Sequence, residues 1–152
     1  MLSKIVWFTG LSGAGKTTLS LILKKKLEKY NLKIKLVDGD NFRKQNKVKN
    51  KFTKLNIIEN NLKIIEYVKN IHKKYDYTII SVISPLKKTR LKARKIFGEN
   101  YNEVYVKCSI SKLVKRDTKG LYKLAKKNKI KNLIEFNSKI NYESTNYKKI
   151  VI

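Results

Sequence analysis

Short apolar runs alternate along this sequence with longer stretches that have a helical period. The runs KIVWFT, KIKLV and YTIISVIS are mostly apolar, which is typical of strands that are covered on both faces. We expect strands at residues 4–9, 33–37, 77–84, 104–108 and 150–152. We expect helices at residues 16–30, 53–75, 87–96 and 111–131. The stretch 41–52 shows neither period, so we expect a loop there.

The longest helical pattern begins at Thr53, a residue type that caps helix N-termini well. Its periodic face carries Ile57, Asn61, Ile64, Ile65 and Val68. Strands separated by such helices predict an α/β fold, in which a mostly parallel sheet of about five strands has helices on both faces. The length of 152 residues fits one domain.

A glycine-rich segment, GLSGAGKTT at residues 10–18, follows the first strand and leads into the first helix. Two glycines five positions apart, followed by Lys16 and Thr17, match the phosphate-binding loop (P-loop). In that loop, backbone N–H groups surround a polyphosphate, the lysine reaches the β- and γ-phosphates, and the threonine hydroxyl holds Mg²⁺. We therefore expect a nucleoside triphosphate as ligand.

The segment DGDNFR at residues 38–43 places two carboxylates and an arginine at the end of the second strand. A carboxylate there can orient an acceptor hydroxyl and accept its proton, or hold water on the metal ion. Arg43 can make a two-pronged contact with a phosphate. Together with the P-loop, Asp38, Asp40 and Arg43 indicate a phosphoryl-transfer site.

The net charge of +26 would ordinarily indicate a nucleic-acid partner. However, only four of the 37 basic residues are arginines, and the lysines are spread over every segment. We interpret this charge as a general compositional bias that attracts anionic nucleotides, and we do not expect a nucleic-acid partner. The single cysteine, Cys108, cannot form an internal disulfide, and the apolar start is too short for a signal peptide or a membrane span. We expect a cytoplasmic protein without a membrane partner.

Several longer motifs give a more specific resemblance. In chain order they are WFTGLSGAGKTTLS, VDGDNFR, ISPLKKTRLKAR, RDTKGLYKLAKKNKIKN and NYES. Together they resemble the adenylylsulfate kinases, which use ATP to phosphorylate the ribose 3′-hydroxyl of adenosine 5′-phosphosulfate (APS). The resemblance implies a three-layer P-loop kinase fold that includes a mobile lid at about 116–131. The resemblance also implies that the protein can form a homodimer.

On the donor side, the resemblance implies an ATP site made by the P-loop and by Arg116, which would lie near the donor base. The loop residues concerned are Gly10, Ser12, Gly13, Ala14, Gly15, Lys16, Thr17 and Thr18. The catalytic residues would be Lys16 and Asp40. The metal ion would be Mg²⁺ on Thr17, with Asp38 or Asp40 acting through water.

On the acceptor side, the resemblance implies a larger set of contacts. The residues concerned are Asp40, Arg43, Phe52, Asn60, Ile83, Ser84, Lys119 and Leu133. Phe52 would stack on the acceptor base, and Lys119 would reach from the lid toward bound phosphates. For Arg90 and Arg94 two interpretations stay open, a role in the site and a solvated helix face.

The departures from the family pattern fall on the acceptor side. The span KQNKVKNK replaces a glycine-rich stretch, Ile57 replaces an arginine that grips the acceptor, and Leu133 replaces an aromatic residue. Either Lys54 supplies the lost charge and APS is the acceptor, or the pocket takes another nucleotide-linked acceptor, such as a pyrimidine, sugar or phosphoramidate nucleotide. An inactive relative and a nucleotide-regulated protein that binds RNA or a partner are further alternatives.

Overall fold

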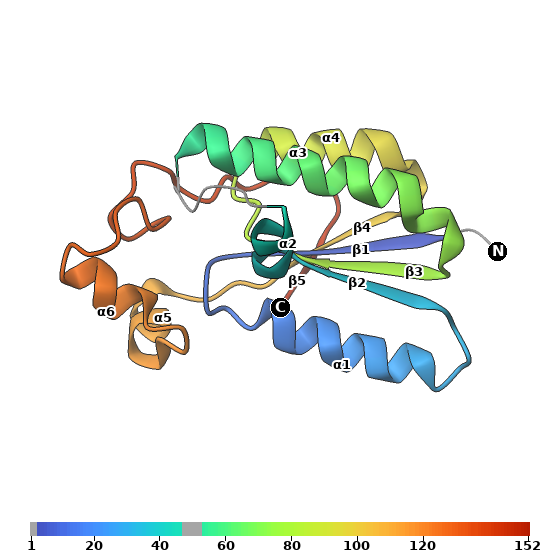
Figure 1. The fold of residues 1–152 in the computed structure, drawn as a ribbon, viewed down its shortest axis with the longest axis horizontal. Helices are drawn as coiled ribbons and strands as arrows, with labels where there is room; N and C mark the ends of the chain where they lie inside the picture. The colour runs from blue at the N-terminus through green and yellow to red at the C-terminus, as the bar shows by residue number, and fades with distance from the viewer. Residues whose placement is uncertain (1–2, 47–52) are drawn as a thin grey trace.

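The computed structural model describes residues 3–46 and 53–152 (Figure 1). Its strands are β1 (Lys4–Thr9), β2 (Ile34–Asp38), β3 (Tyr77–Ser81), β4 (Tyr101–Tyr105) and β5 (Ile150–Val151). Its α-helices are α1 (Lys16–Glu28), α2 (Gly39–Gln45), α3 (Lys54–Ile71), α4 (Lys87–Phe97), α5 (Ile110–Arg116) and α6 (Leu121–Lys126).

The strands form one parallel sheet in the order β2-β3-β1-β4-β5. The first strand lies in the middle of the sheet, where Ile5 pairs with Thr78 of β3 and with Tyr101 of β4. Because every strand points the same way, all the carboxyl ends lie at one edge. Ligands of open parallel sheets bind at this edge.

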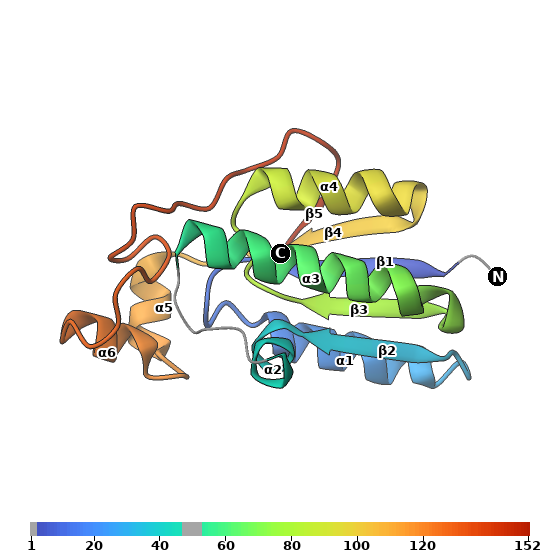
Figure 2. The ribbon, with the colours of Figure 1, turned by 45° about the horizontal axis from the view of Figure 1, so that its top comes forward.

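Helices cover both faces of the sheet and complete the three layers expected from the sequence (Figures 1 and 2). On one face, Val6, Phe8 and Ile79 belong to a buried cluster that includes leucines of α1. On the opposite face, Trp7 and Ile80 pack with apolar residues of α3 and α4. This alternation along β1 and β3 follows from the period of two in a strand. The predicted α/β fold, a parallel five-stranded sheet with helices on both faces, is therefore confirmed.

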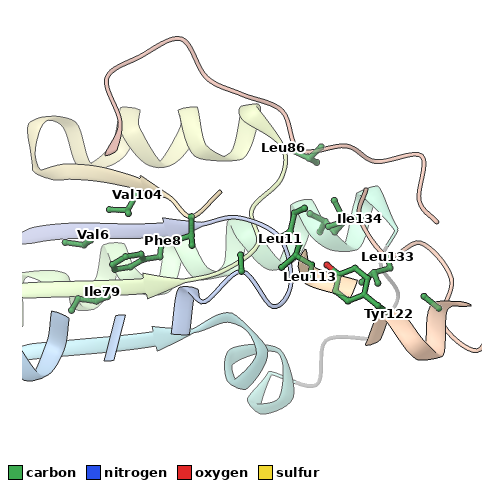
Figure 3. Packing of buried hydrophobic residues seen from close by; sticks show 14 residues of the cluster. Val6, Phe8, Leu11, Ile79, Leu86, Val104, Leu113, Tyr122, Leu133 and Ile134 are labelled. Carbon is green, nitrogen blue, oxygen red and sulfur yellow. The ribbon is translucent and has the colours of Figure 1, made fainter. Parts of the chain in front are cut away.

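The first of these clusters extends beyond the strands toward α5 and α6 (Figure 3). Leu11 in the P-loop, Leu113 on α5, Tyr122 on α6 and Leu133 are all buried there. The Tyr122 hydroxyl donates a hydrogen bond of 3.0 Å to the backbone oxygen of Ser12. The predicted lid segment is therefore packed directly on the P-loop in this structure, while its mobility stays a prediction.

The structure corrects the predicted loop at 41–52, because α2 occupies Gly39–Gln45. Asp38 begins this helix: its Oδ1 accepts hydrogen bonds from the backbone N–H groups of Asp40 (3.0 Å) and Asn41 (3.1 Å). Such a cap stabilises a short helix that has no apolar period of its own. Residues 47–52, including Phe52, lie outside the described residues.

Several other boundaries differ from the prediction. Strand β3 ends at Ser81 and not at residue 84, and α3 ends at Ile71 and not at Tyr75. The helix expected at 111–131 is two short helices, because the chain turns between them at Asp117 and Gly120, both with positive φ. Strand β4 begins three residues earlier than expected, at Tyr101, where it pairs with Ile5. Within residues 3–46 and 53–152, we find no helix that is both long and apolar enough to cross a membrane.

Candidate active site

The P-loop connects the end of β1 to the start of α1. Gly10 has φ +140°, and a Cβ atom at this position would lie 2.4 Å from the backbone oxygen of Val106. Only glycine fits there without moving the neighbouring chain. Gly15 precedes α1 in a left-handed conformation, and no side chain caps the helix start. The first N–H groups of α1 therefore remain free of side-chain caps at a position suited to an anion.

Lys16 is buried at the start of α1, where its Nζ donates a 2.7 Å hydrogen bond to the backbone oxygen of Leu11. Burial, followed by the positive charge of Lys119, lowers the pKa of Lys16 from 10.5 to about 8. The carboxylates of Asp40 and Asp38 oppose this shift but do not cancel it. A bound anion would favour the charged form of this amine.

Thr17 and Asp38 come together between α1 and β2. The Thr17 hydroxyl donates a 3.0 Å hydrogen bond to Oδ2 of Asp38 and lies 3.4 Å from the Ser81 hydroxyl. Asp38 uses its other oxygen to cap α2, so its position is fixed by two elements at once. The arrangement presents hydroxyl and carboxylate oxygens beside the P-loop.

Asp40 lies in the first turn of α2 and forms ion pairs with Arg43 of the same helix and with Lys119 of the predicted lid. Burial alone would raise the pKa of Asp40. The hydrogen bonds and charges of Lys119 and Arg43 outweigh burial and hold that pKa below its ordinary value of 3.8. Asp40 is therefore an ionised carboxylate at neutral pH, and it links the DGD segment to the segment predicted as a lid.

These groups surround one cavity of about 270 Å³ at the carboxyl edge of the sheet. It brings together most of the residues predicted for the donor and acceptor sites. Those that line it are Ser12, Gly13, Gly15, Lys16, Thr17, Thr18, Asp40, Arg43, Asn60, Ile83, Ser84, Arg116 and Lys119. The proposed metal ligand Asp38 lines it too.

Other predicted positions do not line the cavity. Gly10 and Ala14 shape the P-loop from its buried side. Leu133 is buried in the core, and its neighbour Ile134 lines the cavity instead. Lys54 lines a separate groove and does not line the cavity that contains Ile57.

Sequence reasoning missed the place of Asn61 in the cavity and left two interpretations open for Arg90. Asn61 was predicted only as part of the buried face of α3, but it lines the cavity beside Ile57 and Asn60. It lies four residues after Ile57, which places both on one side of a helix. The four-residue spacing indicated that Asn61 and Ile57 lie on the same side of α3. In the sequence, however, a residue that lines a cavity on that side looks the same as one that packs in the core.

Arg90 is fully buried, so a solvated helix face was the wrong interpretation for this arginine. It donates hydrogen bonds to the backbone oxygens of Ser84 (2.5 Å) and Glu143, and its Nε lies 3.4 Å from Oε1 of Glu103. Ser84 has φ +41°, a conformation that non-glycine residues rarely adopt. Arg90 thus helps to hold a cavity-lining residue in an unusual backbone shape.

Comparison with known proteins agrees with this geometry. The family model described as adenylylsulphate kinase matches residues 2–152. The chain is 39% identical over 134 residues to the adenylyl-sulfate kinase of Clostridium acetobutylicum, covering 88% of this chain and 67% of that protein. It is also 39% identical over 132 residues to a probable adenylyl-sulfate kinase of Archaeoglobus fulgidus, covering 87% of this chain and 84% of that protein.

Solved structures show the same likeness. The structure of the Mycobacterium tuberculosis APS kinase CysC in complex with AMPPNP and APS has a TM-score of 0.89 and 27% identity, covering 99% of this chain and 87% of that chain. The fold and the P-loop define an ATP-dependent kinase of the α/β P-loop class. Within that class, the chain belongs to the adenylylsulphate kinase family.

Proposed function

We propose that this protein transfers the γ-phosphoryl group of ATP to the ribose 3′-hydroxyl of APS, giving 3′-phosphoadenylylsulfate and ADP. The observation that carries the proposal is that one cavity joins the P-loop to Asp40, Arg43 and Asn60. In the reaction, a bond forms between the 3′-oxygen and the γ-phosphorus, and the bond from that phosphorus to the β,γ-bridging oxygen breaks. The hydroxyl proton passes to Asp40.

On the donor side, the P-loop N–H groups would bind the phosphates, and Lys16 would neutralise the charge that develops on the β,γ-bridge. Arg116, at the end of α5, lines the same cavity and would contact the donor nucleotide. Lys16 must leave the backbone oxygen of Leu11 to reach the phosphates.

On the acceptor side, Asp40 would orient the 3′-hydroxyl as a general base, because it is ionised and lines the same cavity as the P-loop. Arg43 and Lys119 would exchange part of their contact with Asp40 for the acceptor's anionic groups. Asn60, Ile83 and Ser84 would form the wall on which the acceptor rests.

The oxygen atoms of Thr17 and Asp38 fit Mg²⁺, which prefers oxygen ligands and keeps several waters. We propose that the Thr17 hydroxyl and the ATP phosphates bind the ion and that Asp38 holds one of its waters. In the described part of the chain, no group of three or more His, Cys, Asp or Glu residues could hold a metal. Mg²⁺ would supply charge neutralisation at the phosphates.

The proposal is tested by measuring ADP release with APS and with a panel of other nucleotides as acceptors. We expect strong ATP turnover with APS, and its loss in Lys16→Ala with an unchanged circular dichroism spectrum. Turnover close to wild type in the folded Lys16→Ala protein would contradict the kinase mechanism as written.

A different nucleotide acceptor is the second candidate, because Ile57 lines the cavity where the family pattern has an arginine. If APS is the acceptor, Ile57→Arg adds a charge-assisted hydrogen bond, worth about 1.5–3 kcal/mol, and should lower KM for APS by roughly tenfold or more. If the cavity is shaped for another acceptor, the variant gains nothing on APS. A strong response to a different nucleotide in the panel would then identify that acceptor.

A further inference from the structure

The wall of the cavity formed by α3 contains two adjacent asparagines, Asn60 and Asn61, that are each 2% exposed. Both have a buried side-chain oxygen, Oδ1, for which the described part of the chain provides no hydrogen-bond donor. Trp7, Thr78 and Arg90 also have a buried atom without a hydrogen-bond partner, but none of these three residues lines the cavity.

The orientation of the Asn61 amide is fixed by its own helix. Its Nδ2 donates a 2.8 Å hydrogen bond to the backbone oxygen of Ile57. Reversing the amide would place Oδ1 against that oxygen, where two acceptors repel each other. The atom without a partner is therefore an oxygen, which can only accept a hydrogen bond.

A buried amide oxygen without a donor destabilises the fold, and an apolar side chain of similar size would avoid this loss. Asparagine is also a weak helix former. The fold thus gives no reason for Asn61, whereas a ligand in the cavity does, if it brings a donor. Phosphate and sulfate oxygens are acceptors, and Lys16, Arg43 and Lys119 already provide donors for them.

We propose that Asn61 is a specificity-determining residue of the acceptor pocket, where its Oδ1 accepts a hydrogen bond from a hydroxyl or amino group of the acceptor's adenosine. The inference rests on the proposed function, because it takes APS as the acceptor. It adds a contact on the uncharged part of the acceptor, which is the part that distinguishes one nucleotide from another.

The test compares Asn61→Leu with Asn70→Leu, a matched change at an exposed position of the same helix. For Asn61→Leu we expect KM for APS to rise roughly tenfold, with KM for ATP unchanged. The melting temperature without ligand should stay the same or rise, because an unpaired buried oxygen is removed. Asn70→Leu should leave both KM values unchanged.

A purely structural role would give the opposite pattern. If Asn61→Leu lowers the melting temperature and leaves KM for APS at the wild-type value, the inference is overturned while the proposed function stands. If the wild-type protein shows no APS-dependent turnover, both the proposed function and the inference are overturned. These two failures are distinguishable because the first requires an active wild-type enzyme.

Three APS analogues identify the donor: the 2′-deoxy and 3′-deoxy forms, and the inosine form, which lacks the amino group. Calorimetry measures the binding of each to wild-type protein and to Asn61→Leu. The affinity difference between the two proteins should vanish for the analogue that lacks the donor read by Asn61. A difference that persists with all three analogues would overturn the inference.

Discussion

At the scale of single residues, the site is governed by how buried charges are compensated. Lys16 is buried against a neutral backbone oxygen, and it therefore has a lowered pKa. Asp40 has two cationic partners, and its pKa is lowered as well, which for a carboxylate means that the charged form is favoured. The site therefore holds an ionised carboxylate near the buried ammonium group of Lys16, and a bound anion would favour the charged form of that ammonium group.

The lowered pKa of Lys16 predicts that ATP binding depends on pH. In the proposed mechanism the charged form of Lys16 binds phosphate, and its pKa of about 8 means that this form is lost as pH rises through that value. We expect ATP affinity to fall above that pH, by up to roughly tenfold per pH unit. Calorimetric titrations between pH 7 and 9.5, at saturating Mg²⁺, measure the change. Lys16→Ala should bind weakly without this step, and a flat wild-type profile would contradict the prediction.

The two carboxylates of the DGD segment should respond differently to neutral replacement. Asp40→Asn removes the proposed general base and should lower kcat by roughly 10²- to 10⁴-fold, with a smaller effect on ATP affinity. Asp38→Asn should be milder, because asparagine also caps helices well and α2 should persist. Steady-state kinetics of both variants test this order. A larger loss in Asp38→Asn would mean that the two roles are exchanged.

At the scale of elements, the helices and strands that could be predicted are those with a clear local sequence pattern. The parallel strands, α1, the capped start of α3 and the P-loop all follow from local sequence. The helix at Gly39–Gln45 could not be predicted in this way, because its stability comes from one cap, Asp38, and from contacts with β2 and α3. The candidate site has the same limit. Lys16 could be predicted because it belongs to a sequence motif, whereas the buried oxygen of Asn61 that lacks a hydrogen-bond donor is found only in the structure.

Arg90 shows how one side chain ties several elements together. From α4 it reaches the Ser84 backbone, the Glu143 backbone near the C-terminus and the buried Glu103 of β4. Glu103 also accepts hydrogen bonds from Tyr101, Thr145 and Tyr147. Removing the arginine would leave this carboxylate buried without its cation.

We therefore expect Arg90→Met to reduce the free energy of unfolding by roughly 3–5 kcal/mol, as for other broken buried ion pairs. Adding Glu103→Gln should recover part of the loss, because it removes the uncompensated charge. Urea unfolding of both single variants and the double variant measures the coupling. Strictly additive losses would show that the pair does not act as a unit.

At the scale of the whole molecule, the question is how a net charge of +26 affects a site for anionic substrates. Helices α5 and α6 lie beyond the carboxyl ends of the strands, whereas the end of α1 lies at the other end of the sheet (Figure 1). Charges act over a Debye length of about 8 Å at physiological salt, and a helix as long as α1 spans about 20 Å. Lysines near the cavity should therefore matter more than the total charge.

Two triple variants remove the same charge at different places. Changing Lys123, Lys126 and Lys127 of the α6 region to glutamine should lower kcat/KM for ATP several-fold at about 50 mM salt, because these exposed lysines steer the nucleotide toward the P-loop. Changing the exposed Lys25, Lys29 and Lys73 should have little effect. The deficit of the first variant should shrink as salt is raised to about 300 mM. Equal losses in both variants would mean that net charge, and not its placement, attracts the substrates.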